Sequence, residues 1–108
     1  MTGEAAGRAD TAAEAIRALN YATLPAAGTL TGPADVYDVV GALATLTGRL
    51  PQILSQLQSF LAGEHAAGRV RIVDGPHTGD PTAALAESDR WLTCAAGAAD
   101  TLRHALEQ

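Results

Sequence analysis

Three histidines, one cysteine and a few close carboxylates are the side chains of this sequence that could carry chemistry. The histidines are His65, His77 and His104. A metal site needs three or four ligands at helical or hairpin spacing, but here Glu64 beside His65 and Asp100 four residues before His104 are the best companions. We therefore interpret the histidines as surface residues, and we expect neither a metal site nor a cofactor.

Cys94 is the single cysteine, which rules out an internal disulfide. A thiol that acts as a nucleophile needs a positioned base, and the adjacent residues 93–97 supply none. Small, mostly apolar neighbours are typical of a packed thiol that has no chemical role. We therefore expect Cys94 to be packed.

Two pairs of carboxylates stand close together, Asp35 with Asp38 and Glu87 with Asp89. Compact helical nucleotide pyrophosphohydrolases bind magnesium through acidic pairs, but their pattern repeats an E-x-x-E spacing on two facing helices. The first pair here is explained by the start of a helix, whose dipole favours carboxylates. The second pair is typical of a solvated helix face. No catalytic residue is assigned, and the sequence favours a protein that is not an enzyme.

The most distinctive polar stretch is ALNYATL (18–24) with PADVYDVVGAL (33–43), where two predicted helices meet a loop. It gathers hydrogen-bonding groups that could form a small polar pocket or a partner surface. The candidate residues are Asn20, Tyr21, Tyr37 and Asp38. The alternative interpretation is that the tyrosine rings pack and that their hydroxyls bond locally.

The length and the alanine content describe one domain with a thin core. At 108 residues we expect an unstructured N-terminus over 1–8 and a single helical domain over 9–108. Alanine supplies 24 residues, and burying so small a side chain contributes little at ~25 cal/mol per Å². Such a core is often completed by association with a second copy.

Charge and hydropathy argue against two classes of partner. The net charge is −5, there is no lysine, and the seven arginines are scattered along the chain, whereas nucleic-acid-binding proteins carry a clustered basic face. No apolar run approaches the ~20 residues of a membrane span, and the polar start MTGEAAGRAD is unlike a secretory signal. We expect a cytoplasmic protein that binds neither nucleic acid nor membrane.

The first helix is predicted over about 10–21. Asp10 or Thr11 can cap its N-terminus, because both side chains accept hydrogen bonds from free backbone N–H groups. The segment that follows, 23–35, contains two prolines, two glycines and three threonines, and this composition predicts a loop.

The last helix, over 80–107, has the clearest start. Asp80 is the expected N-cap and Pro81 the first helical residue. The preceding segment, 68–79, is rich in glycine and is predicted to be a connector. Its RVRIV sequence at 69–73 is β-branched and leaves a short strand open as an alternative.

Between these segments, apolar positions recur at alternating steps of four and three, as on one face of a helix. They are Val36, Val40, Leu43, Thr47, Leu50, Leu54, Leu57 and Leu61. A flanking line adds Val39, Leu46, Ile53 and Phe60. The pattern predicts a helix over about 33–67.

Gly48 and Pro51 interrupt this pattern, but its phase does not change across them. Proline inside a helix costs about 3 kcal/mol, so a turn at this point is the alternative. Both possibilities give an all-α fold. If the helix continues through Pro51 with a kink, segments 33–67 and 80–107 form a long antiparallel hairpin, to which the short N-terminal helix is added. If the chain turns at Gly48–Pro51, the result is a compact four-helix bundle. We favour the hairpin.

The stretches ALNYATLP, PADVYDVVGAL and GRLPQILSQLQSFL resemble small alanine-rich helical proteins of actinobacteria that have no assigned activity. The resemblance covers about residues 15–65, implies a helical fold and offers no catalytic residues to carry over to this chain. The chain also has the size of the WXG-type helical hairpins of those bacteria. It lacks their W-x-G turn, since Leu92 and Thr93 follow Trp91, and the likeness is one of architecture only.

These observations predict a non-catalytic helical protein that self-associates, as a dimer, through apolar helix faces. Two alternatives are an adaptor or regulator that binds another protein, encoded for example in a mobile element, and a small helical enzyme or ligand-binding module. The candidate interface residues of the first interpretation are Leu43, Leu50, Leu54, Leu57, Leu61, Trp91 and Leu92.

Overall fold

The computed structural model describes residues 3–108, and this part of the chain contains helices and loops but no strand. The elements in order are α1 (Glu4–Ala22), a 3₁₀ turn η1 (Pro25–Ala27), α2 (Pro33–Ala66) and α3 (Pro81–Leu106). The chain divides into two compact units, one that ends at Asp38 and one over Val39–Gln108. The all-α hairpin is confirmed, while the single domain over 9–108 stays a prediction.

Helix α1 begins at Glu4, several residues before the predicted start near residue 10. Asp10 and Thr11 lie inside the helix, so the prediction that one of them caps it is wrong. Alanine, the strongest helix former, carries the helix through this segment, and Glu4 complements the dipole and pairs with Arg8 at 3.4 Å. The expected unstructured segment 1–8 is thus helical from Glu4 on, and its first two residues lie outside the described part.

Helix α2 begins where the sequence predicts. Pro33 occupies its first position, and a carboxylate oxygen of Asp35 accepts hydrogen bonds from both the backbone N–H and the hydroxyl of Thr31, each at 2.7 Å. The side-chain bond from Thr31 is the main reason why the pKa of Asp35 lies below its ordinary value. The helix ends at Ala66, just before Gly68, whose positive φ of 73° suits the end of a helix.

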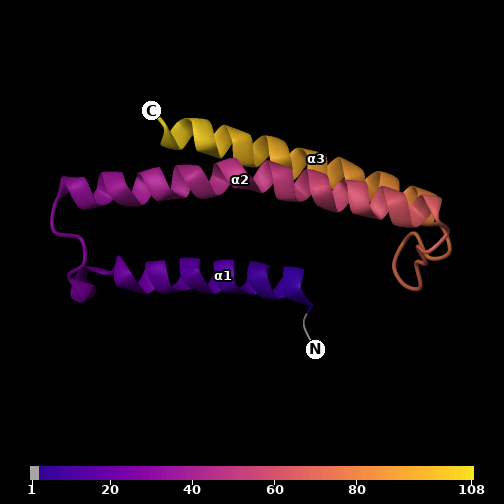
Figure 1. Ribbon diagram of the computed structural model, residues 1–108, viewed down its shortest axis with the longest axis horizontal. Helices are drawn as coiled ribbons and strands as arrows, with labels where there is room; N and C mark the ends of the chain where they lie inside the picture. Colours follow the sequence, from indigo (N-terminus) through magenta and orange to yellow (C-terminus); the bar gives the residue numbers. More distant parts are fainter. Residues whose placement is uncertain (1–2) are drawn as a thin grey trace. The chain divides into compact units, whose positions relative to one another are not determined.

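Helix α2 passes through Pro51 without a break, so the predicted long helix is confirmed and the turn at Gly48–Pro51 is not present. Pro51 has no N–H to offer the carbonyl of Thr47. The Thr47 side chain is buried, and its hydroxyl donates to the carbonyls of Leu43 and Ala44 at 3.0 Å. Figure 1 shows α2 changing direction near its middle, as a helix with an internal proline does.

Helix α3 starts at the predicted cap. Asp80 Oδ1 accepts a hydrogen bond from the N–H of Ala83 at 3.1 Å, and Pro81 follows the cap directly. The connector between α2 and α3, residues 67–80, forms turns, one of them closed by a 2.8 Å bond from Gly79 N–H to the carbonyl of Ile72. The short strand predicted as an alternative for residues 69–73 is not present in the described part of the chain.

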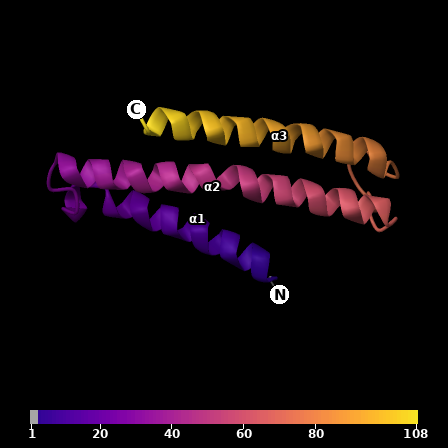
Figure 2. The ribbon, with the colours of Figure 1, turned by 45° about the horizontal axis from the view of Figure 1, so that its top comes forward.

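Helices α2 and α3 pack side by side in opposite directions, as Figures 1 and 2 both show. The residues buried between them are Ala44, Thr47 and Ala99, and no large side chain in residues 3–108 is fully buried. One polar contact also crosses this seam, because the amide of Gln58 donates to the backbone carbonyl and the carboxylate of Asp89 and to the hydroxyl of Thr93, at 2.9 to 3.1 Å. Small residues therefore bring the helices together.

At Gly48, a side chain of α3 comes very close to the backbone of α2. A methyl group at Gly48 would lie 2.8 Å from Cδ of Arg103 on α3, which is too close for two carbon atoms. The Arg103 guanidinium is held by Asp100 at 2.9 Å and Glu107 at 3.1 Å, and these bonds hold its pKa above the ordinary value. Glycine at position 48 thus lets the arginine side chain lie across α2.

This contact predicts a difference between two glycine substitutions in one helix. Gly41 has open space around it, so we expect Gly41→Ala to raise the free energy of unfolding by roughly 0.5 to 1 kcal/mol, because alanine favours helix. Gly48→Ala should give less than this gain or a loss, since Arg103 must move. Urea unfolding at one protein concentration measures both.

The control is the Arg103→Ala background, in which Gly48→Ala should stabilise as much as Gly41→Ala does. Equal gains from the two substitutions in the wild-type background would contradict the close approach.

Candidate functional site

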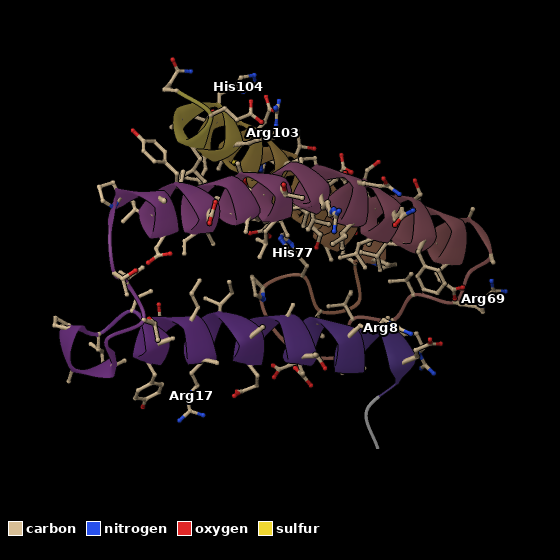
Figure 3. The ribbon with its side chains drawn as sticks, turned by 60° about the vertical axis from the view of Figure 1, so that its left-hand side comes forward. Arg8, Arg17, Arg69, His77, Arg103 and His104 are labelled. Atoms are coloured by element: carbon tan, nitrogen blue, oxygen red, sulfur yellow. The ribbon has the colours of Figure 1, made fainter. Side chains whose placement is uncertain are left out.

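The three histidines lie apart on the structure, and each has its own local partner. His65 Nε2 is 3.3 Å from the Thr82 hydroxyl. His77 contacts Glu87, and Nδ1 of His104, in the last turn of α3, lies 2.8 Å from the carbonyl of Asp100. Figure 3 labels His77 and His104. His104 follows Glu87 by 17 positions on one helix, which is about 25 Å. No group of three or more metal-ligating side chains occurs within residues 3–108.

The Cys94 thiol is exposed, so the prediction that it packs is wrong. Cys94 lies five positions before the buried Ala99 on α3. At 100° per residue this turns it about 140° away from the side that faces α2. The small residues around it therefore line the solvent side of the helix.

The candidate polar pocket residues lie at the end of α1 and at the start of α2. Asn20, Tyr21, Tyr37 and Asp38 are all exposed, and Tyr37 is the most exposed of the large side chains among them at 77%. The Arg17 guanidinium lies 5.9 Å from the centre of the Tyr21 ring, within the range of a cation–π contact. Among the described residues, no hydrogen bond joins Asn20 or Tyr21 of α1 to Tyr37 or Asp38 of α2. The polar pocket stays a prediction.

The seven candidate interface residues divide into two groups. Five are half-buried: Leu43, Leu50, Leu54, Leu61 and Leu92. The other two, Leu57 and Trp91, are exposed by 48% and 62%. The apolar pattern of α2 is thus largely occupied by contacts within the hairpin, and part of it remains open to solvent.

Sequence reasoning left Ile53 and Phe60 out of the candidate interface, although they are exposed by 49% and 66%. They belong to the flanking line, whose seven-residue spacing placed them beside the main apolar positions. Ile53 precedes Leu57 by one helical turn, and Phe60 follows it by nearly one turn. We call Ile53, Leu57, Phe60 and Trp91 the exposed apolar face.

A hollow of about 450 Å³ is centred on this face. It is lined by Leu57, Phe60, Leu61, Ser88, Trp91 and Leu92, with three residues from each helix. Leu61, Ser88 and Leu92 are half-buried and are here called its floor, while the three more exposed residues, Leu57, Phe60 and Trp91, are called its walls. Apart from the Ser88 hydroxyl and the Trp91 indole nitrogen, the lining side chains are hydrocarbon.

A second groove, of about 380 Å³, also lies between α2 and α3 and shares Leu61 and Leu92 with the hollow. Four of its five polar side chains contact each other in pairs, since Gln58 bonds Asp89 and His65 contacts Thr82, and Ser88 is the fifth. These contacts connect α2 to α3 and leave the groove without a distinct chemical signature.

Trp91 is linked to the connector through one carboxylate. Its indole N–H donates to Glu87 Oε1 at 3.5 Å, and His77 Nε2 contacts Glu87 Oε2. A further hollow of about 380 Å³ beside this group includes Ile72 and Asp74 of the connector. Glu87 therefore contacts both the tryptophan and the connector.

The bond from His77 is the main reason why the pKa of Glu87 lies below its ordinary value of 4.5. The bond from Trp91 and the nearby charges of His77 and Arg90 act in the same direction, and desolvation opposes them. The folded state thus prefers the ionised carboxylate.

The exposed apolar face lies in a stretch with very little charge. Between Val39 and Gly63, Arg49 is the one charged residue. The remaining polar side chains in this stretch of α2 are serines, threonines and glutamines. The net charge of −5 is therefore carried by other parts of the chain.

Comparisons of the chain with protein-family models, with curated proteins and with solved structures gave no match. None of the helices in the described part of the chain combines the length and the apolarity that a membrane crossing requires. The site is therefore interpreted from its own geometry.

The lowered pKa of Glu87 predicts an acid transition near Trp91. A carboxyl whose pKa is lower in the folded state stabilises the fold above its ordinary pKa, and this contribution is lost as the pH falls through the folded value. We expect Trp91 fluorescence to change as the pH falls below 4.5, because protonated Glu87 releases His77. In Glu87→Gln this step should be absent.

Asp100→Asn is the matched control, since Asp100 also has a lowered pKa but its main partner is Arg103. This variant should keep the fluorescence step. An unchanged step in Glu87→Gln would show that the link does not exist in solution.

Proposed function

We propose that this chain is a non-catalytic helical interaction protein that self-associates, as a dimer, through the exposed apolar face of its hairpin. The observation that carries the proposal is this face itself, in which two aromatic and two aliphatic side chains remain 48 to 66% exposed. Solvent-exposed apolar patches on proteins commonly mark interaction sites.

The weak core of the hairpin supports the same conclusion. The residues buried between α2 and α3 are two alanines and a threonine, and these supply little apolar burial. At roughly 100 Å² for each of the four exposed side chains, two copies would bring ~800 Å² of apolar surface together. Specific interfaces bury about 1,200 to 2,000 Å² in total, so this face supplies a large part of what a dimer needs.

The charge distribution favours a second copy as the occupant. Two chains that each carry −5 repel one another at long range. On α2 the exposed apolar face is flanked by one charged residue, Arg49, over 25 positions, from Val39 to Gly63, so contact across it places no acidic side chains of α2 opposite each other. On its α2 side, a dimer formed here therefore avoids this repulsion.

We also propose the cytoplasm as the location of the protein. The support is the free Cys94 thiol, which is exposed and has no second cysteine in its chain to pair with. Exposed thiols of this kind persist in reducing compartments.

Light scattering after size-exclusion chromatography tests self-association. At micromolar concentration we expect the wild-type chain to show about twice its mass of 11.0 kDa. Phe60→Glu should reduce the mass to that of one chain, because the interface would bury an unpaired carboxylate. The exposure of Phe60 means that the change should not unfold the hairpin, and circular dichroism checks this.

Ser55→Glu is the matched control, since it adds the same charge to α2 at an exposed position outside the apolar face. It should keep the mass of the wild type. A wild-type chain that remains at 11.0 kDa over this concentration range would contradict the proposal.

A further inference from the structure

The hollow on the exposed apolar face has a strongly exposed aromatic side chain at its edge. Phe60 is 66% exposed, while the floor of the hollow beside it is formed by Leu61, Ser88 and Leu92. The projection and the recess therefore lie on the same patch. A twofold axis requires this arrangement, since each copy presents the same surface to the other.

The two aromatic walls differ in how they are held. The Trp91 indole is linked to Glu87 at 3.5 Å and borders the hollow at the connector as well. Phe60 has no polar atom, so its ring can be buried completely with no hydrogen bond to replace. Phe60 is therefore the side chain that is suited to enter a second copy, with Trp91 as a fixed wall.

The size of the side chain at position 88 affects how much space the hollow has for an inserted side chain. It occupies a position of the apolar pattern of α3, three residues after Leu85 and four before Leu92, where a leucine would continue the pattern. A serine at this point leaves the floor low between the walls. Ser88 thus places a small side chain among the six residues that line the hollow of about 450 Å³.

We propose that two copies dock about a twofold axis, with the Phe60 ring of each inserted into the hollow of the other, above Ser88. This inference rests on the proposed self-association and adds its geometry. The two Phe60 rings lie near the axis, where aromatic rings pack favourably at centre distances of about 4.5 to 7 Å. The occupant of the hollow is a second copy of this chain.

Ser88→Leu tests the geometry. Leucine would fill the hollow, so we expect the dissociation constant of the dimer, measured by sedimentation equilibrium, to rise at least tenfold. If the face associates without inserting a side chain, the added apolar surface should leave the constant unchanged or lower it. That result would overturn the inference but leave self-association standing. A wild-type chain that stays monomeric would overturn both.

The control Ser55→Leu adds the same group outside the apolar face and should leave the dissociation constant within about twofold.

Disulfide trapping gives a second measurement that does not depend on the folding of Ser88→Leu. In a Cys94→Ser background, a Phe60→Cys chain mixed with a Ser88→Cys chain should form a mixed disulfide. A Thr101→Cys chain, whose cysteine is exposed on α3, should not form one with Phe60→Cys. Equal trapping of both pairs, or none, would overturn the docking geometry.

Discussion

The structure depends on one constraint, which is that two helices packed side by side can cover only one side of each other. The α2–α3 hairpin meets this limit with small residues, because Ala44, Thr47 and Ala99 are the side chains buried at its seam. None of its large apolar residues is completely covered, and the four of the exposed apolar face remain 48 to 66% exposed, so the hydrophobic effect still acts on the part that remains in water. A hairpin built in this way leaves apolar side chains exposed, and the proposed dimer would cover part of them.

The unusual residues of α2 fit this constraint. Pro51 bends the helix without ending it, and Gly48 admits the Arg103 side chain from α3. The bulky flanking residues of α2 lie at helix positions beside the seam, and Phe60 and Trp91 both line the hollow there. The hairpin thus combines a seam of small residues with an exposed apolar face.

The sequence predicted the elements better than the surfaces. The apolar pattern keeps its phase across Pro51, and it correctly predicted that α2 continues through the proline. Asp80 and Pro81 correctly predicted the start of α3. The start of α1 was missed because alanine carries a helix forward without any cap signal. The exposure of Cys94, Ile53 and Phe60 was not predictable from spacing. An apolar band wider than one seam does not reveal which of its edges faces the neighbouring helix.

In the proposed dimer, association between copies completes the core of the hairpin, and the dependence of unfolding on protein concentration tests whether it does. If folding and association are linked, mass action makes the fold more stable as the protein concentration rises. We predict that the urea midpoint, followed by the fluorescence of Trp91 and by helical circular dichroism, increases steadily from low to high micromolar concentration. A midpoint that stays constant over this range would show that the chain completes its core alone, and it would contradict the account.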